Sequence, residues 1–440
     1  MTAEPTATPF RLSDEAVVPL QLDPTAPLDD LAWLDRAIGD ARVVAIGESA
    51  HYHHESFLLR HRLCRYLVER HGFGAYALES GFVEGWQADA WVRGGDGRPD
   101  RAMADGLTSL MGLWTPQRAH LEWLRQHNRT AARPVGFYGI DLPGSMVSLL
   151  PGLDAVFAHL AEADPEFSPD PGLRQTAAGF AAASAFSAPA AMAAYKALAP
   201  EAKDALTAGL ADLSARLTSR RLDHVRRTTA EAHDRALRSL RTTIALDAML
   251  RELARGHHDG ALHNREATLA DTVEWILRRE DRIVLAAHNG HVQRCPDNLP
   301  VVPPTTLGMH LADRLGDGYL AIGTTSATGR TLNTSPSFYT GTLFTDLEET
   351  PQPGSLDALM AARHHGPFAT DLRRLPPADA AALRAVTQHR YGTFYADHNP
   401  LDAFDLLVHL PHATPADPDT DALTHAPDDI REAFARWRAM

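Results

Sequence analysis

Short runs of β-branched and apolar residues alternate along this chain with segments whose apolar residues recur at helical spacing. The clearest runs are Arg42–Ile46, Ala75–Leu78, Val135–Ile140, Ile283–Ala287, Tyr319–Ile322 and Leu406–Leu410. Between the first two runs, Glu55–Arg70 has a helical pattern, and Gly72 is a typical residue for ending such a helix. Strand, helix, strand is typical of a parallel sheet covered by helices. The sequence therefore predicts an α/β fold, a parallel sheet flanked by helices in three layers.

The middle of the chain differs in composition from its flanks. Residues 151–256 are rich in Ala, Leu and Arg and contain no strand-like run. Within them, Glu201–Arg220 and His224–Arg255 predict long amphipathic helices. We therefore expect an all-helical insert at 151–260, acting as a lid or substrate domain, that splits an α/β core of residues 30–150 and 261–415. Residues 416–440 are expected to form a tail with a short helix.

Charge and histidine content restrict the class of protein. The 440 residues include 42 basic and 56 acidic side chains, which give a formal net charge of −14. This balance argues against nucleic acid and against an anionic membrane surface as partners. Only Lys196 and Lys203 are lysines, which disfavours Schiff-base chemistry. The 23 histidines favour proton transfer or metal ligation instead.

The sequence shows neither a targeting signal nor a cysteine motif. Residues 1–14 lack the apolar core of a signal peptide, and no stretch is apolar enough to predict a membrane span. Cys64 and Cys295 do not lie in a Cys-x-x-Cys motif, so neither a disulfide framework nor a zinc knuckle is indicated. We expect a cytoplasmic protein.

Ionisable side chains follow four of the predicted strands at the point where each strand ends. They are Glu48 and His51 after the first strand, Glu79 after the second, Asp141 after the third, and His288 and His291 after the fourth. In open α/β sheets, ligands bind at the carboxyl ends of the strands. The sequence therefore predicts an enzyme active site at that edge of the sheet.

The three-residue spacing of Glu48 and His51 places both side chains on one face if they lie at a helix N-terminus. A carboxylate beside an imidazole favours the tautomer that can act as a base, and it stabilises the imidazolium that forms. The same spacing also fits a helix-capping Glu48 and a surface His51.

His288 and His291 flank an Asn-Gly turn dipeptide. They can bind substrate, donate to an oxyanion or ligate a metal, or one of them can be satisfied by the backbone of a polar turn. Together with Glu48, His51 and Glu79 they would provide enough metal ligands. We nevertheless favour direct general-base catalysis, with no metal and no cofactor.

Two arginines are candidate partners of these carboxylates. Glu79 is expected to act in the active site, to pair with Arg60 or Arg265, or to do both. Arg265 can supply positive charge to an oxyanion or to a substrate carboxylate, or it can begin a surface helix. For Asp141, which precedes Leu-Pro-Gly, a structural turn is the favoured interpretation.

Five blocks of the sequence, taken together, resemble the erythromycin esterase family. They are Val44–His51, Phe73–Gly81, Phe137–Asp141, Asn264–Ala270 and Ile283–Val292. The resemblance implies an α/β core with a large helical insert and a hydrolase in which His51 is the general base that acts on water. It also implies that Glu48 and Glu79 orient and polarise the water, and that the pocket is lined by His288, His291, Arg60 and Arg265.

No Gly-x-Ser-x-Gly motif is present, so a nucleophile elbow is not indicated. We therefore expect direct attack by water on an ester or macrolactone, without an acyl-enzyme. The expected substrate is a large, partly apolar small molecule, and the family links such activity to macrolides and antibiotic resistance. Two alternatives remain: a lyase or cyclase of natural-product biosynthesis that uses the same His51 base, and a metal-dependent member of the wider superfamily.

Overall fold

The computed structural model describes residues 10–296, 305–363 and 365–439. Residues 1–9, part of the segment used to predict location, lie outside this range. The chain divides into two compact units. Unit 1 comprises Met1–Phe73, Arg282–Ser335 and Phe344–Ala416, and unit 2 comprises Gly74–Asp281, Pro336–Leu343 and Asp417–Met440. These units differ from the expected boundaries, since the second and third predicted strands group with the helices of the middle region. The division into a split core and a lid domain stays a prediction.

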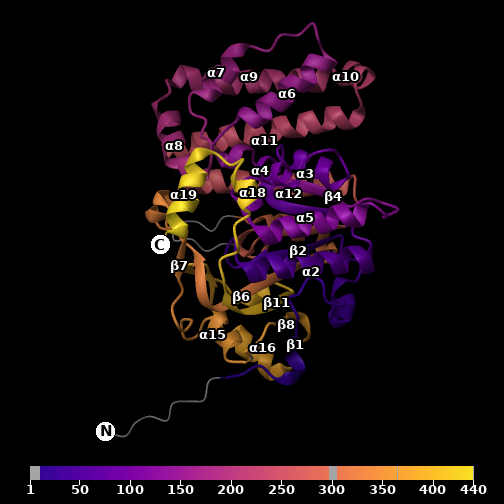
Figure 1. Ribbon diagram of the computed structural model, residues 1–440, viewed down its shortest axis with the longest axis vertical. Helices are drawn as coiled ribbons and strands as arrows, with labels where there is room; N and C mark the ends of the chain where they lie inside the picture. The colour runs from indigo at the N-terminus through magenta and orange to yellow at the C-terminus, as the bar shows by residue number, and fades with distance from the viewer. Residues whose placement is uncertain (1–9, 297–304, 364, 440) are drawn as a thin grey trace. The chain divides into compact units, whose positions relative to one another are not determined.

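Unit 1 is built on a mixed, mostly parallel sheet (Figure 1). Its hydrogen-bonded order is β1 (Val18–Pro19), β8 (Phe368–Asp371), β11 (Leu406–Ala413), β6 (Tyr319–Leu332), β2 (Val43–Glu48) and β5 (Ile283–His288). The last four strands are mutually parallel, whereas β8 and β1 are antiparallel additions, and β7 (Phe344–Asp346) pairs antiparallel with the end of β6. Every residue of β2 is buried, as expected for a strand in the middle of a covered parallel sheet.

Helices and one hairpin complete unit 1. The helices are α1 (Asp35–Ile38), α2 (His54–His71), α13 (Asn289–Val292), α14 (Leu307–Leu315), α15 (Leu356–Ala361), α16 (Pro377–Arg384) and α17 (Pro400–Ala403), and the hairpin is β9 (Gln388–Tyr391) with β10 (Phe394–Asp397). Short 3₁₀ helices lie at Asp14–Ala16, Asp29–Leu34, Gly316–Gly318 and Leu372–Arg374. The helix predicted between the first two strands is confirmed, and it ends at Gly72, whose φ of 67° is left-handed.

Unit 2 contains the parallel pair β3 (Ala75–Gly81) and β4 (Gly136–Asp141). The helices packed with this pair or near it are α3 (Gly85–Val92), α4 (Pro99–Gly106), α5 (Thr115–Asn128), α18 (Thr420–Leu423) and α19 (Asp428–Arg438). Short 3₁₀ helices lie at Met111–Leu113, Gly144–Met146, Ala185–Ser187 and Pro336–Thr340. The predicted short helix of the tail is therefore present as α19.

The middle of the chain forms helices only, within the part that the structure describes. They are α6 (Leu150–Ala163), α7 (Pro171–Ala178), α8 (Ala188–Ala197), α9 (Pro200–Ser219), α10 (Arg221–Arg227), α11 (Ala230–Arg255) and α12 (His258–Leu277). α6 and α9 both pack against α11 around a buried, leucine-rich core (Figure 1). The helix predicted over Glu201–Arg220 is confirmed as α9. The helix predicted over His224–Arg255 is confirmed from Ala230 onward as α11, but its predicted start is wrong, because a helix ends at Arg227 and Thr229 caps α11.

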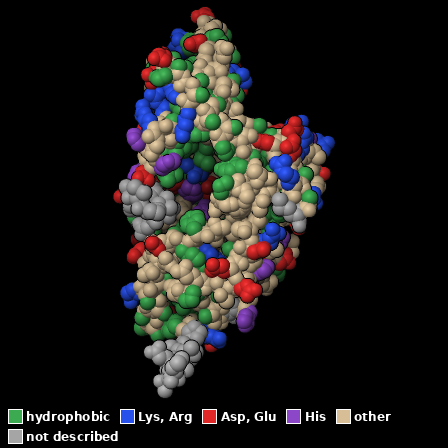
Figure 2. Space-filling model, turned by 90° about the vertical axis from the view of Figure 1, so that its left-hand side faces the viewer, with side chains coloured by type: hydrophobic (Ala, Val, Ile, Leu, Met, Phe, Trp, Pro, Cys, Tyr) green, Lys and Arg blue, Asp and Glu red, His purple; other side chains and the backbone are tan. Residues whose placement is uncertain are grey.

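The predicted fold class is confirmed: a mostly parallel sheet flanked by helices, with a large all-helical segment. Among the described residues, no helix combines the length and hydropathy needed to cross a membrane. Acidic and basic side chains are interspersed with apolar ones on the face shown in Figure 2.

Candidate active site

The loop after β2 brings two predicted catalytic residues together. Glu48 ends the strand and is completely buried, and α2 begins only at His54. His51 therefore lies in a loop and not at a helix N-terminus, which corrects the predicted local geometry. The loop turns back through Tyr52, whose φ of 68° is a left-handed conformation that costs about 1–3 kcal/mol for a non-glycine residue. In this loop, His51 Nδ1 lies 2.6 Å from Glu48 Oε1.

This contact fixes the tautomer of His51. A carboxylate oxygen accepts a hydrogen bond, so Nδ1 carries the proton and the lone pair is on Nε2. The His51 side chain is 23% exposed, whereas that of Glu48 is 0% exposed. An accessible imidazole is thus held by a desolvated carboxylate, which will stabilise the imidazolium once Nε2 has taken a proton.

Arg60 supports the carboxylate from α2. Its Nη1 lies 3.2 Å from Glu48 Oε2, and its guanidinium lies 4.6 Å from the centre of the Phe57 ring. The Arg60 side chain is 1% exposed. A side chain this deeply buried was not expected for a residue predicted to line the pocket. Its contact with Glu48 is that of a residue that positions this carboxylate. A role of Arg60 toward substrate stays a prediction.

His288, the last residue of β5, lies beside His51, with 5.4 Å between the ring centres. Its Nε2–H donates to the Ser49 carbonyl at 3.2 Å, and its Nδ1 accepts the Gly290 N–H at 3.1 Å. The backbone therefore engages both ring nitrogens, as in the turn interpretation of this motif. His291 is half-buried in α13, and its contact with substrate stays a prediction.

Asn289 has a structural role that its turn-like sequence context did not reveal. Its fully buried amide donates to the Thr324 carbonyl at 2.8 Å and accepts the Thr324 N–H at 3.1 Å. A Cβ at Gly47 would overlap Asn289 Oδ1. The glycine before Glu48 is therefore needed so that this amide can reach β6.

Unit 2 contains the other predicted carboxylate. Arg265 Nη2 lies 3.3 Å from Glu79 Oε1 and 2.6 Å from Asp141 Oδ2, and its Nε donates to Asp141 Oδ1 at 3.0 Å. Asp141 also accepts the Leu142 N–H at 2.8 Å, which agrees with its predicted structural role. Of the two predicted partners of Glu79, the structure therefore pairs it with Arg265.

Arg265 does not begin a surface helix. It lies in the body of α12, and its side chain is 12% exposed. Burial acts to lower its pKa, but the charge and hydrogen bonds of Asp141, aided by Glu79 and Glu266, outweigh burial and raise the pKa. The guanidinium stays charged, and its charge is balanced by carboxylates. The predicted roles of Glu79 in catalysis and of Arg265 in substrate binding stay predictions.

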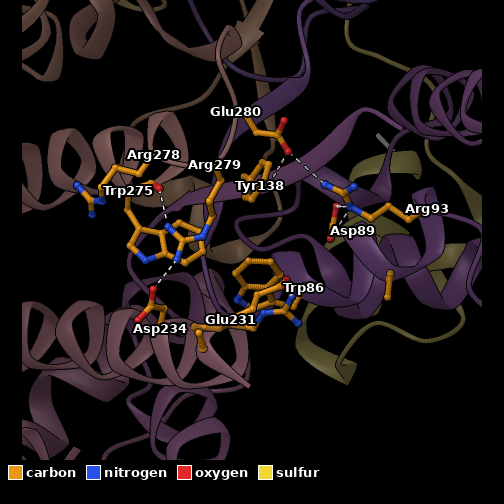
Figure 3. Close-up of a pocket in the computed structure, with 13 residues that line it drawn as sticks. Trp86, Asp89, Arg93, Tyr138, Glu231, Asp234, Trp275, Arg278, Arg279 and Glu280 are labelled. Carbon is orange, nitrogen blue, oxygen red and sulfur yellow. Dashed lines mark hydrogen bonds and ion pairs between the residues drawn. The ribbon is translucent and has the colours of Figure 1, made fainter. Parts of the chain in front are cut away.

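A cavity of about 820 Å³ in unit 2 involves none of the predicted site residues. Several of its charged side chains pair with one another, as Figure 3 shows for Arg279 with Asp234 and for Arg93 with Glu280. Its lining contains no histidine, serine or cysteine. Since this cavity provides no imidazole base, the loop after β2 remains the candidate catalytic site.

Comparison with known proteins now identifies the family. The erythromycin esterase profile matches residues 68–413. The chain belongs to the erythromycin esterase family. It is 31% identical over 330 residues to erythromycin esterase type II of Escherichia coli, covering 71% of this chain and 76% of that protein. Erythromycin esterase type I of the same organism is 27% identical over 333 residues, covering 72% and 76%.

Solved structures show the same fold. A Bacillus cereus protein superposes with a TM-score of 0.75 at 22% identity, covering 91% of this chain and 96% of that one. A mutant of the erythromycin esterase EreC in its open conformation gives a TM-score of 0.73 at 23% identity, covering 91% and 98%. Membership of the erythromycin esterase family supports a hydrolase. Since the profile match begins after His51, the roles assigned to Glu48 and His51 depend on their geometry.

This member of the erythromycin esterase family also contains a histidine cluster that the sequence did not predict. His159, His224 and His233 are buried together in the helical segment. Burial first, and then the neighbouring imidazoles, lower the pKa of His159 to about 4 and also lower the pKa of His233. His159 is far in sequence from His224 and His233, and the three residues match no metal-binding spacing.

Proposed function

We propose that this protein is an esterase that hydrolyses an ester or macrolactone by direct attack of water, with His51 as the general base. The observation that carries this proposal is the 2.6 Å contact between His51 Nδ1 and buried Glu48. It gives a partly exposed imidazole the tautomer and the counter-charge that proton abstraction requires. Membership of the erythromycin esterase family supports the hydrolytic class.

In the proposed reaction, His51 Nε2 takes a proton from water as the water oxygen attacks the ester carbonyl carbon. The resulting tetrahedral intermediate breaks the bond between the carbonyl carbon and the alkoxy oxygen, and the leaving oxygen takes the proton back from Nε2. The products are a carboxylic acid and an alcohol, which remain on one open chain when the substrate is a lactone. Arg60 holds Glu48 in place and balances its charge during the cycle.

We propose a macrolide lactone as the first substrate class to test. Two curated relatives are named erythromycin esterases, and one is 31% identical to this chain. Such a substrate is a bulky, partly apolar organic molecule. The net charge of −14 disfavours nucleic acid or an anionic membrane surface as a target. A role in macrolide resistance and a cytoplasmic location belong to the same proposal.

Turnover of macrolides and simpler lactones in oxygen-18 water tests this function. Hydrolysis places one labelled oxygen in the new carboxylate, detected by mass spectrometry as a 2-dalton shift, whereas a lyase or cyclase gives unlabelled product. His51→Gln should abolish labelled product. His412→Gln, which changes an exposed histidine of unit 1, should leave it unchanged. Product without label, or equal labelling by the His51 variant, would overturn the proposal.

A further inference from the structure

His159, His224 and His233 meet inside the helical segment of unit 2. One ligand nitrogen from each lies within 4.8 Å of the other two. Their exposures are 8%, 0% and 0%. The neighbouring ring centres are 5.6–5.8 Å apart, and the rings are tilted or edge-on to one another. Three imidazoles therefore converge on one buried point.

The ring nitrogens at this point have no hydrogen-bond partner among the described residues. They are His159 Nε2, His224 Nδ1 and both nitrogens of His233. A buried polar atom without a partner typically costs about 1–3 kcal/mol, and native proteins contain few of them. An occupant bound by one nitrogen of each ring would satisfy three of these four atoms.

The backbone arrangement explains why these residues converge. His159 lies on the buried stripe of α6, among Leu153, Val156 and Leu160. His224 is the buried residue of α10. His233 lies in the first turns of α11, which begins after residues 228–229 interrupt the helical path. The cluster therefore links three helices, two of which meet at an irregular junction.

A carboxylate next to the cluster can orient one ring. Asp164 Oδ2 lies 3.4 Å from His224 Nε2 and 2.7 Å from Arg216 Nη2. Donation from Nε2–H to Asp164 puts the His224 lone pair on Nδ1, which is the nitrogen without a partner. A carboxylate behind a ligating imidazole is a common feature of metal sites.

Charge and access are compatible with a cation. Arg216 and Arg220 are directed to Asp164, at 2.7 and 3.9 Å, and not to the unpaired nitrogens. His159, which is 8% exposed, also lines a cavity of about 580 Å³ in unit 2, so the cluster lies next to a cavity. Three neutral imidazoles with one remaining position are a ligand set typical of zinc.

We propose that His159, His224 and His233 form a binding site for a divalent transition metal, zinc in the first instance, that fastens α6 to the junction of α10 and α11. Imidazole-only ligation also suits cobalt, nickel and copper, and excludes calcium and magnesium as preferred ions. In a tetrahedral zinc site, Zn–N bonds of about 2.0–2.1 Å put the nitrogens ~3.3 Å apart. Small side-chain rotations from the present spacing would achieve this. The site is independent of the proposed catalytic residues.

The test uses the full chain, purified without a histidine tag, stripped with a chelator and reloaded with zinc or cobalt. We expect one zinc per chain by elemental analysis and the visible absorption of tetrahedral cobalt. Saturating zinc should raise the Tm by ~5 °C. His233→Gln should weaken cobalt binding at least ~100-fold, while His258→Gln, which removes an exposed histidine of the same unit, should bind as the unchanged protein does.

His159→Gln provides a second variant at the rim of the cluster in case His233→Gln fails to fold. Its far-ultraviolet circular dichroism should match that of the unchanged protein, while its cobalt absorption and its zinc-induced Tm rise are lost. The proposal is overturned if the stripped protein takes up no stoichiometric metal, or if both folded glutamine variants bind cobalt as tightly as His258→Gln does. None of these readouts uses hydrolysis, so a failure of the esterase proposal would leave this result unaffected.

Discussion

His51 and the three histidines of the helical segment differ in two respects: how close a carboxylate lies to the ring, and how far the ring is exposed to solvent. His51 is partly exposed and its Nδ1 contacts a buried carboxylate at 2.6 Å. Within the cluster, the nearest carboxylate contact is Asp164 to His224 at 3.4 Å, and Arg216 shares that carboxylate. The carboxylate of the first setting stabilises a proton added to His51, whereas burial in the second lowers the pKa of His159 and His233 and leaves ring nitrogens without a partner among the described residues.

The difference shows what decides the use of a histidine. Imidazole chemistry is the same in both places, so the carboxylate and the solvent exposure determine whether the ring serves as a base or as a ligand. Changes that remove the carboxylate from His51, or the histidines from their buried positions, therefore test the comparison directly.

Replacing His51 itself should have the largest effect. We expect His51→Gln to lower kcat/KM by ~10²–10⁴-fold, because the general base is lost while the neighbouring Glu48–Arg60 pair remains. Steady-state kinetics on the best substrate of the lactone screen measures this. Unchanged thermal unfolding would show that the loss is catalytic, and activity within a few-fold of the unchanged enzyme would contradict the assignment.

Removing Arg60, the cation that contacts buried Glu48, should chiefly lower the free energy of unfolding. Arg60→Met leaves a buried carboxylate without its cation, so we expect a loss of about 3 kcal/mol in unfolding free energy. The double variant Glu48→Gln/Arg60→Met removes both charges and should be less destabilised than the sum of the single variants. Denaturant titration of all three provides the coupling energy, and additive losses would show that the pair is not an energetic unit.

The sequence predicted some parts of this picture and not others. The strands ending at Glu48, Glu79, Asp141 and His288 have continuous apolar runs, and such runs signal buried parallel strands well. β1 and the β9–β10 hairpin were not predicted, since their strands are short, and β1 also depends on pairing with the distant β8.

The sequence likewise predicted only some of the side-chain contacts described above. The pairing of Glu48 with His51 followed from three-residue spacing, although His51 lies in a loop and not at a helix N-terminus. The histidine cluster could not be predicted, because His159 and His224 are 65 positions apart and only helix packing brings them together. Local spacing predicts local contacts, whereas contacts across a core require the fold.

Other buried histidines should destabilise the protein in acid. In unit 1, burial first, with Arg390 adding to it, lowers the pKa of His389 to about 3, and burial together with His389 lowers that of His398 to about 3. The unfolded chain, with an ordinary pKa of 6.5, binds more protons between these values. Stability should therefore fall as the pH falls from about 6.5 toward 3, by up to ~1.4 kcal/mol per pH unit for each histidine.

Unfolding measured between pH 7 and pH 4 tests this slope. His398→Gln removes one of the buried titrating histidines, so its slope should be shallower by up to one proton. His412→Gln, at an exposed position, is the matched control and should keep the full slope. Identical slopes in all three proteins would show that these rings do not stay neutral in the folded state.

The smallest expected effect concerns the junction that carries two members of the cluster. Thr229 Oγ1 accepts the Ala232 N–H at 3.0 Å and so caps α11, whose early turns hold His233. Thr229→Ala should cost about 1 kcal/mol of unfolding free energy, and Thr229→Ser, which keeps the hydroxyl, should cost less. If His233 is a metal ligand, fraying of this turn competes with binding, so Thr229→Ala should also weaken cobalt affinity about fivefold. A stability loss without any change in cobalt affinity would show that fraying of the first turn of α11 does not affect metal binding.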